Sequence, residues 1–322
     1  ISGSIAVSGS IPGQRGVFGG RFPQTLPTNN IMDFITISTG GDAADYGDLR
    51  TTTQTRAMMM CSNGIGGRGL TTQGKSSNQI DYIDLSQPSN AVDFGSLTVG
   101  VYKGNEGDWL TNGSDSRAVF VGGRYPVDET MDFLNITTIG DAIDFGDLTA
   151  DRVLARGESN GLNQRGVMQG GANAVPIGPH SIPDIEYITI STAGNSLNFG
   201  YMRASNYKNY GGSNDINERG VFLDTSDTLD MITISTPSDA IEWSDDHANY
   251  RTGADTGRTN HGWSTAQRIS NGTDDRGVTG GGGPGRHELI QYITFSTPSQ
   301  AIAFGNLTHA GDEVGAASTG AR

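Results

Sequence analysis

The sequence has a single cysteine, no long apolar run and a deficit of positive charge. Cys61 has no second cysteine with which to form an intrachain disulfide or a cysteine-based metal site. No stretch approaches the roughly 18 apolar residues that cross a bilayer, so we expect no membrane insertion. The 21 Lys and Arg residues are outnumbered by 35 Asp and Glu residues, which gives a net charge of −14. Because nucleic-acid binding requires basic side chains that neutralise phosphates, we expect no nucleic-acid partner.

The sequence also lacks the apolar period of about 3.6 residues that marks amphipathic helices. Glycine is abundant instead, with 48 residues in 322. Short runs rich in Ile, Phe, Tyr and Thr are separated by Gly, Asn, Ser and Pro, which is typical of β-strands joined by turns. The pattern therefore predicts an all-β protein.

One phrase recurs through the chain at intervals of about fifty residues. Its core is Ser-Asn-Gly or a close variant, whose third residue lies four positions before an Arg that opens a strand. Copies at 11, 64, 113, 161, 215, 272 and 320 give spacings of 53, 49, 48, 54, 57 and 48. Such a period, with four predicted strands in each unit, indicates a blade or solenoid array, and one closed array counts as one domain.

We therefore predict a single β-propeller domain over residues 1–322, built from six four-stranded antiparallel blades whose terminal strands meet at one seam. Strands with apolar residues on both faces fit this fold, because each sheet lies between two others. The approximate repeats are 5–49, 57–98, 108–149, 153–204, 207–246 and 263–308, with a partial seventh at 315–322.

Three sets of residues recur at fixed positions in the repeats. A ring of arginines could bind an anion, but we expect each guanidinium to satisfy backbone carbonyls or an acidic residue of a neighbouring strand. We expect the aromatic of the fourth strand to be core, and the asparagine of the Ser-Asn-Gly phrase to be a turn residue, since asparagine tolerates left-handed backbone geometry. The three sets are Arg15, Arg68, Arg117, Arg165, Arg219 and Arg276; Tyr46, Phe94, Phe145, Phe199, Trp243 and Phe304; and Asn63, Asn112, Asn160, Asn214 and Asn271.

The repeats resemble those of the kelch family. They share an apolar strand ending in Gly-Gly (19–20, 122–123, 170–171 and 280–281), an aromatic in the last strand and an Arg before the next blade. Arg-Gly-Val-Phe-Gly-Gly at 15–20 and Asp-Phe-Gly-Asp-Leu-Thr at 144–149 resemble, more closely, the kelch-like repeats of virion structural and tail-fibre proteins of marine, notably cyanobacterial, phages. The resemblance covers essentially the whole chain. It implies a β-propeller in a virion, and so an extracellular location.

Recognition is expected where the repeats differ. The connections from second to third strand, and from fourth strand to the next blade, vary in length and leave the same edge of each blade. They should form one face of the disc, which we call the variable face. Aromatic rings that stack on sugars, beside polar groups that bind hydroxyls, would suit a glycan ligand there. The candidate binding residues are Tyr102, Tyr125, His180, Tyr250, Asp255, His261, Trp263 and His287.

Metal and catalytic sites are weakly supported. No two of the five histidines have metal-ligand spacing, and we expect no cofactor. Sialidase-type Asp boxes are absent, and Cys61 lacks the Tyr and His partners of kelch-type copper oxidases. A carboxylate pair for glycoside hydrolysis stays open, since its separation is invisible in a sequence. Oxygen ligands for Ca²⁺ or Mg²⁺ are offered by Asp224 and Asp227, by Asp245, Asp246 and Asp255, and by Asp312 and Glu313, although solvated carboxylates are the expected state.

The sequence therefore predicts a non-enzymatic propeller of a phage virion. Its expected partners are a host cell-surface glycan or receptor and other virion proteins, with display in many copies. The alternatives are a passive structural or assembly module of the virion and a glycan-active propeller enzyme.

Overall fold

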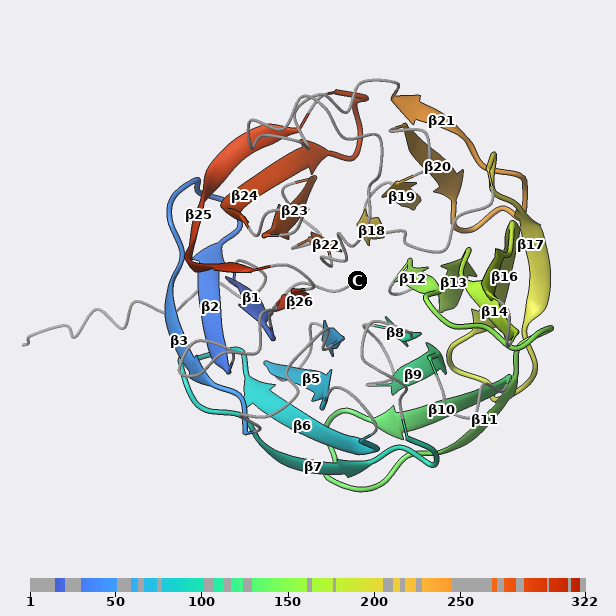
Figure 1. Cartoon of the computed structure of the whole chain (residues 1–322), viewed down its shortest axis with the longest axis horizontal. Helices are drawn as coiled ribbons and strands as arrows, with labels where there is room; N and C mark the ends of the chain where they lie inside the picture. Colours follow the sequence, from blue (N-terminus) through green and yellow to red (C-terminus); the bar gives the residue numbers. More distant parts are fainter. Residues whose placement is uncertain are drawn as a thin grey trace, which may run out of the picture.

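The computed structural model shows a six-bladed β-propeller (Figure 1). It describes residues 15–20, 30–50, 59–62, 67–73, 77–100, 107–112, 117–123, 129–160, 164–175, 178–204, 211–214, 218–223, 228–244, 268–270, 275–281, 287–299, 301–311 and 314–318. Within these ranges every regular element is a β-strand, and an apolar helix of membrane-spanning length is absent from them. The all-β fold and the six four-stranded antiparallel sheets confirm the prediction.

In each blade the strands run from the central axis outwards in chain order, except at the seam. Blade 1 contains β26 (Gly315–Ser318), β1 (Arg15–Gly19), β2 (Ile31–Thr36) and β3 (Ala44–Asp48). Blade 2 contains β4 (Met60–Ser62), β5 (Arg68–Thr72), β6 (Gln79–Asp84) and β7 (Val92–Ser96). Blade 3 contains β8 (Gly107–Thr111), β9 (Arg117–Gly122), β10 (Thr130–Asn135) and β11 (Ile143–Asp147).

The second half of the ring repeats this order, with one additional hairpin. Blade 4 contains β12 (Arg156–Ser159), β13 (Arg165–Gln169), β16 (Asp184–Thr189) and β17 (Leu197–Tyr201). Blade 5 contains β18 (Gly211–Asn214), β19 (Arg219–Leu223), β20 (Leu229–Thr233) and β21 (Ile241–Ser244). Blade 6 contains β22 (Arg268–Ile269), β23 (Arg276–Gly280), β24 (His287–Thr294) and β25 (Ile302–Gly311). The hairpin in blade 4 consists of β14 (Ala172–Val175) and β15 (Gly178–Ser181).

The two ends of the chain meet in blade 1, as predicted. Strand β26, drawn in red, pairs antiparallel with β1, drawn in blue, so that Ser318 lies opposite Gly16 and Gly315 opposite Gly19 (Figure 1). The partial seventh repeat thus supplies the innermost strand of the first blade, and the ring is closed by strand pairing. Residues 5–14, which the sequence assigns to the first repeat, lie outside the described residues.

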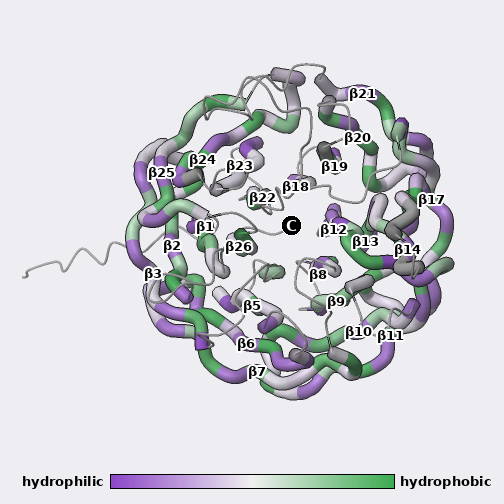
Figure 2. Tube along the Cα trace, in the orientation of Figure 1, coloured by the Kyte–Doolittle hydropathy of each residue, from purple (hydrophilic) through white to green (hydrophobic). Residues whose placement is uncertain are grey.

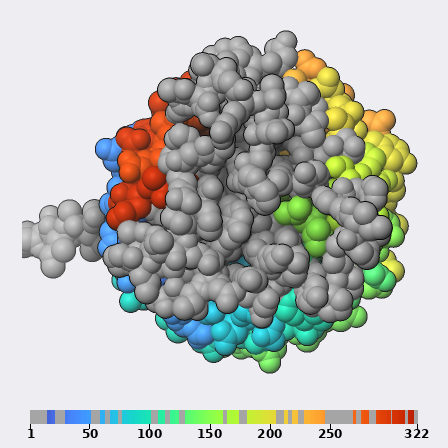
Figure 3. All heavy atoms as spheres, in the orientation of Figure 1, coloured from blue at the N-terminus to red at the C-terminus, as the bar shows by residue number. Residues whose placement is uncertain are grey.

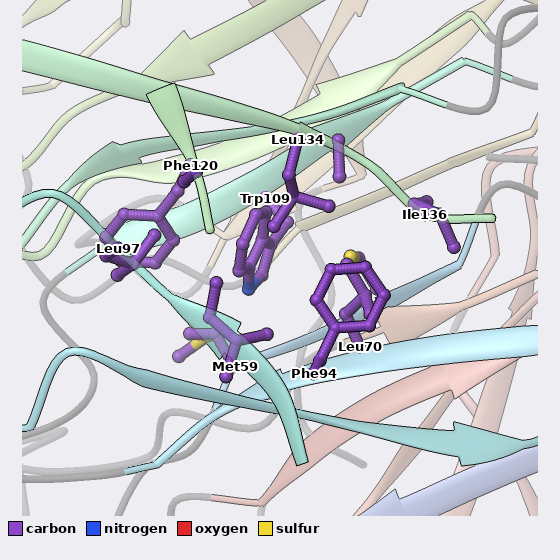
Figure 4. Close-up of a cluster of buried hydrophobic side chains, with 12 residues drawn as sticks. Met59, Leu70, Phe94, Leu97, Trp109, Phe120, Leu134 and Ile136 are labelled. Carbon is purple, nitrogen blue, oxygen red and sulfur yellow. The ribbon is translucent and has the colours of Figure 1, made fainter. Parts of the chain in front are cut away.

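Apolar side chains fill the spaces between neighbouring blades. In Figure 4, Phe94 of blade 2 and Trp109 and Phe120 of blade 3 belong to one buried cluster, and the Trp109 and Phe120 rings meet edge to face with centroids 5.0 Å apart. In β6, Ile80 joins this cluster whereas Ile83 joins the cluster shared with blade 1. Each sheet is therefore covered on both faces, and apolar and polar residues alternate along the blades (Figure 2). All six fourth-strand aromatics are buried, which confirms their assignment to the core.

The phrase of an aromatic residue followed by glycine, which recurs in five of the six fourth strands, joins those blades to the next. In β11 the chain bulges at Gly146, whose φ is +139°, and an added Cβ would lie 2.6 Å from the backbone oxygen of Gly194 in blade 4. This close approach allows Gly194 to donate its N–H to the oxygen of Phe145 at 2.8 Å. Only glycine combines this φ with such a short separation, which explains why the phrase is kept.

Candidate functional site

The repeated arginines are used between blades. Arg117 Nη1 donates to the backbone oxygen of Ile190 in blade 4 at 3.3 Å, and its guanidinium carbon lies 4.8 Å from the centre of the Phe133 ring. Arg276 closes the ring, because its Nη1 donates to the oxygens of Ile37 and Ser38 in blade 1. Equivalent bonds to the next blade are made by Arg15, Arg68, Arg165 and Arg219. The structural role expected for these residues is confirmed.

Asn112 and Asn160 are turn residues, as expected, and their side-chain oxygens close the turns. Asn160 is not left-handed; its side-chain oxygen accepts the N–H of Arg165 at 2.9 Å and so closes the turn. The left-handed position belongs to the residue before the arginine, for example Gln164 with φ 66° and Asp275 with φ 56°. Asn214 reaches across to blade 6, where its Nδ2 donates to Asp275 at 2.8 Å. Asn63 and Asn271 lie outside the described residues.

Five of the six third strands bury a carboxylate whose position the sequence analysis did not single out. Asp132 accepts hydrogen bonds from the backbone N–H and the hydroxyl of Thr98 in blade 2, at 2.9 and 2.6 Å. Burial raises the pKa of the equivalent Asp81, although a hydrogen bond from Gln73 and the charge of Arg50 oppose the rise. The five residues are Asp33, Asp81, Asp132, Glu186 and Asp230. They receive donors from the preceding blade and thereby join blades, as the arginines do.

Most candidate binding residues lie outside the described part of the chain. This holds for Tyr102, Tyr125, Tyr250, Asp255, His261 and Trp263, and also for the carboxylates suggested for Ca²⁺ or Mg²⁺. The other two are on different blades: the backbone of His180 lies in β15 of blade 4, and that of His287 opens β24 of blade 6. The described residues contain no group of three or more His, Cys, Asp or Glu side chains suited to hold a metal ion.

The variable face carries one regular element, the β14–β15 hairpin of blade 4, among the connections that the structure describes. In it Ala172 lies opposite Ser181, Asn173 opposite His180 and Val175 opposite Gly178. Its base is tied to the link between blades 3 and 4, because Ala172 and Val153 exchange backbone hydrogen bonds of 2.8 and 2.9 Å. This contact needs the glycine that precedes Ala172, since a Cβ on Gly171 (φ +94°) would lie 2.6 Å from the oxygen of Val153.

A buried arginine lies beneath the hairpin. The side chain of Arg152 is fully buried, and its Nη1 donates to the oxygens of Gly170 at 3.1 Å and Asp184 at 3.3 Å. Its Nη2 forms an ion pair with Glu186, the buried carboxylate of blade 4. Burial lowers the pKa of Arg152, and the charges of Glu186 and Asp184 oppose that shift. Arg152 thus joins the start and the end of the hairpin to the third strand of the blade.

A second departure from the repeats lies in β12, the innermost strand of blade 4. Glu158 is only 3% exposed and occupies the position that Leu110 holds in blade 3 and Ile269 in blade 6. Its Oε1 accepts a hydrogen bond from Gln169 at 3.1 Å. The backbones of blade 5 make room for it, because a Cβ on Gly211 would collide with the carboxylate.

Glu158 forms a small polar pocket with Asp108, Arg156 and the glycines of β18. The pocket has room for about one water molecule. Atoms of blade 4, drawn in green, are visible beside the centre of the face in Figure 3. A sugar ring needs a far larger site, so the pocket holds water or an ion at most.

Blade 4 therefore contains the polar features that the repeats do not explain. Sequence reasoning predicted the variable connections and His180 within them, but it missed Arg152, Arg156 and Glu158. A signal for Glu158 was present: it is a carboxylate at a position that is apolar in most repeats. No comparable signal existed for Arg152, because its partner Glu186 lies 34 residues away.

No protein-family model matches the chain, and no curated protein matches its sequence.

Proposed function

We propose that the chain is a non-enzymatic, kelch-like propeller of a phage virion that recognises a host-surface glycan through its variable face. The phage assignment is supported by the residue sequences of the repeats, such as Arg-Gly-Val-Phe-Gly-Gly at 15–20. The recognition role is supported by one structural observation: the recurring ionisable residues are engaged between blades. The arginines bond the next blade, and Asp132 and Glu186 accept hydrogen bonds from the preceding one. The side chains that can differ from one repeat to the next, and so contact a particular ligand, are then those of the connecting segments.

The charge of the molecule limits how this recognition works. Bacterial surfaces are generally anionic, so they repel a chain of charge −14. At physiological ionic strength, salt screens this repulsion at separations greater than roughly 8 Å. Attachment must come from short-range contacts, or from Ca²⁺ or Mg²⁺ bridging carboxylates to anionic sugars. Single-site binding of this kind is weak, and display of many copies on one virion raises it by avidity.

A passive assembly module is the second candidate, and the rim of the disc favours it. Five of the six outer strands begin with an aliphatic residue that is about half exposed, as Ile143 and Leu197 show at 57% each. Four of them lie opposite the partly buried aromatic of their own third strand, for example Ile143 opposite Phe133, whereas Ile241 lies opposite Met231. A neighbouring virion protein could cover these residues, and in that role the variable face would bind no sugar.

A glycan array probed with the chain as a monomer and as a multivalent conjugate, beside a hydrolysis assay on the same glycans, separates the three functions. An adhesin binds particular glycans as a conjugate and leaves them intact. An enzyme releases shortened sugars, whereas an assembly module does neither. Tight monomer binding in the presence of a chelator would contradict the dependence on avidity and divalent cations.

A further inference from the structure

We infer that the β14–β15 hairpin of blade 4 determines which glycan the variable face binds, and that this glycan is uncharged. The inference rests on the proposed function and makes it more specific. It is drawn from two properties of blade 4: the fixed base of the hairpin and its lack of charge.

The base of the hairpin is held more firmly than a surface connection requires. Ala172 pairs with Val153 of the preceding link, and the N–H of Ile182 donates to the oxygen of Gly171 at 2.9 Å. Arg152 bonds the oxygens of Gly170 and Asp184, which lie just before and just after this segment. The fully buried Arg152–Glu186 ion pair contrasts with the partly exposed Arg50 and Arg203, which reach the equivalent carboxylates of blades 2 and 5.

Burying an ion pair has a large desolvation cost, and good hydrogen-bond geometry is needed to offset that cost. The bonds of Arg152 supply that geometry, and they position both ends of one segment. A fixed base is what a specific contact element requires, since ordering a loop on binding would consume part of the affinity.

The sequence of the hairpin indicates the class of its ligand. Residues 172–181 read Ala-Asn-Ala-Val-Pro-Ile-Gly-Pro-His-Ser and contain no Asp, Glu, Lys or Arg, in a chain with 35 acidic residues. Prolines at 176, 179 and 183 restrict the backbone before binding. A segment with amide, imidazole, hydroxyl and apolar groups suits the hydroxyls and apolar faces of neutral sugars. It offers no cation for a sialic acid or a phosphate.

The test replaces residues 173–180 with Asn-Gly. Because Ala172 and Ser181 are a paired position, a two-residue turn between them keeps the base of the hairpin and its bonds to Val153. The control variant is Leu197→Ser, which alters an exposed residue of the same blade on the outer rim. Multivalent conjugates of the wild type and of both variants are probed on an array of neutral, sialylated and phosphorylated glycans, at low and at high salt.

We expect the wild type to bind neutral glycans with less than about a twofold change between the two salt concentrations. The shortened variant should lose at least about tenfold of this binding at an unchanged unfolding temperature, while Leu197→Ser keeps it. Wild-type binding to neutral glycans that survives shortening of a folded variant refutes the inference alone, and so does binding restricted to anionic glycans. If the wild type binds no glycan at all, the proposed function fails with it. If the shortened variant does not fold, Asn173→Ala with His180→Ala replaces it, under the same expectation.

Discussion

Replacing Phe145 with Ala tests the division of this propeller into a core and a free rim. Phe145 is 2% exposed and lies in the cluster between blades 3 and 4, where its ring meets that of Phe133 edge to face at 5.8 Å. Burial of a whole aromatic side chain contributes about 1.5–3 kcal/mol, and the cavity and the lost ring contact add to this. We therefore expect Phe145→Ala to lower the free energy of unfolding by about 3–5 kcal/mol.

The matched control lies two residues away on the same strand. Ile143 is 57% exposed, so Ile143→Ala removes little area that folding hides from water and should lower the free energy of unfolding by less than about 1 kcal/mol. Urea unfolding followed by circular dichroism measures both values, and the slope against urea should stay unchanged if the unfolded state is the same. Losses of equal size at the two positions would refute the assignment of the rim and the core.

Three further perturbations follow from the contacts between blades. A chain truncated before residue 314 loses the inner strand of blade 1, and we expect its unfolding temperature to fall. Adding the peptide 314–322 should raise the unfolding temperature again. If the peptide has no effect, β26 does not close the ring. Arg117→Lys keeps the charge but loses the stacking on Phe133 and the fixed bond to Ile190; we expect a loss of about 1 kcal/mol by urea unfolding, and full stability would refute the bridging role. Burial raises the pKa of Tyr46 to about 12; the charge of Asp84 adds to this rise and the charge of Arg15 opposes it. The unfolded chain therefore loses the Tyr46 proton at a lower pH than the folded chain does, and the free energy of unfolding falls between pH 10 and 12. Tyr46→Phe should reduce that fall, and equal pH profiles of the two proteins would contradict the shift.

The fold was predictable because the same residues recur at the same places. Phe145 and its five equivalents occupy one position in every repeat, which identifies them as core, and the repeated arginines identify the junctions between blades. Asn160 was predicted as a turn residue that tolerates left-handed backbone, and it is a turn residue without that backbone. The side-chain oxygen of an asparagine can also close the turn by accepting a backbone N–H, which leaves the left-handed backbone to Gln164.

The candidate site was less predictable, because it depends on departures from the repeats. Among the described residues, the β14–β15 hairpin is the one pair of strands outside the six four-stranded sheets, and its prolines and glycines suggested a loop instead of paired strands. Arg152 and Glu186 meet only once blade 4 has folded, so no local pattern links them. The position of Glu158 was visible in the sequence, but the space that receives it is made by Gly211 of another blade.

The central claim is that this propeller recognises glycans without transforming them, and one measurement tests it most directly. The multivalent wild-type chain is incubated with a glycan array in Ca²⁺ and Mg²⁺, and both the bound protein and the released sugar are measured. The account predicts retention on a defined subset of glycans, with every glycan recovered at its original length. Release of shortened sugar, or the absence of retention on any glycan, would contradict it.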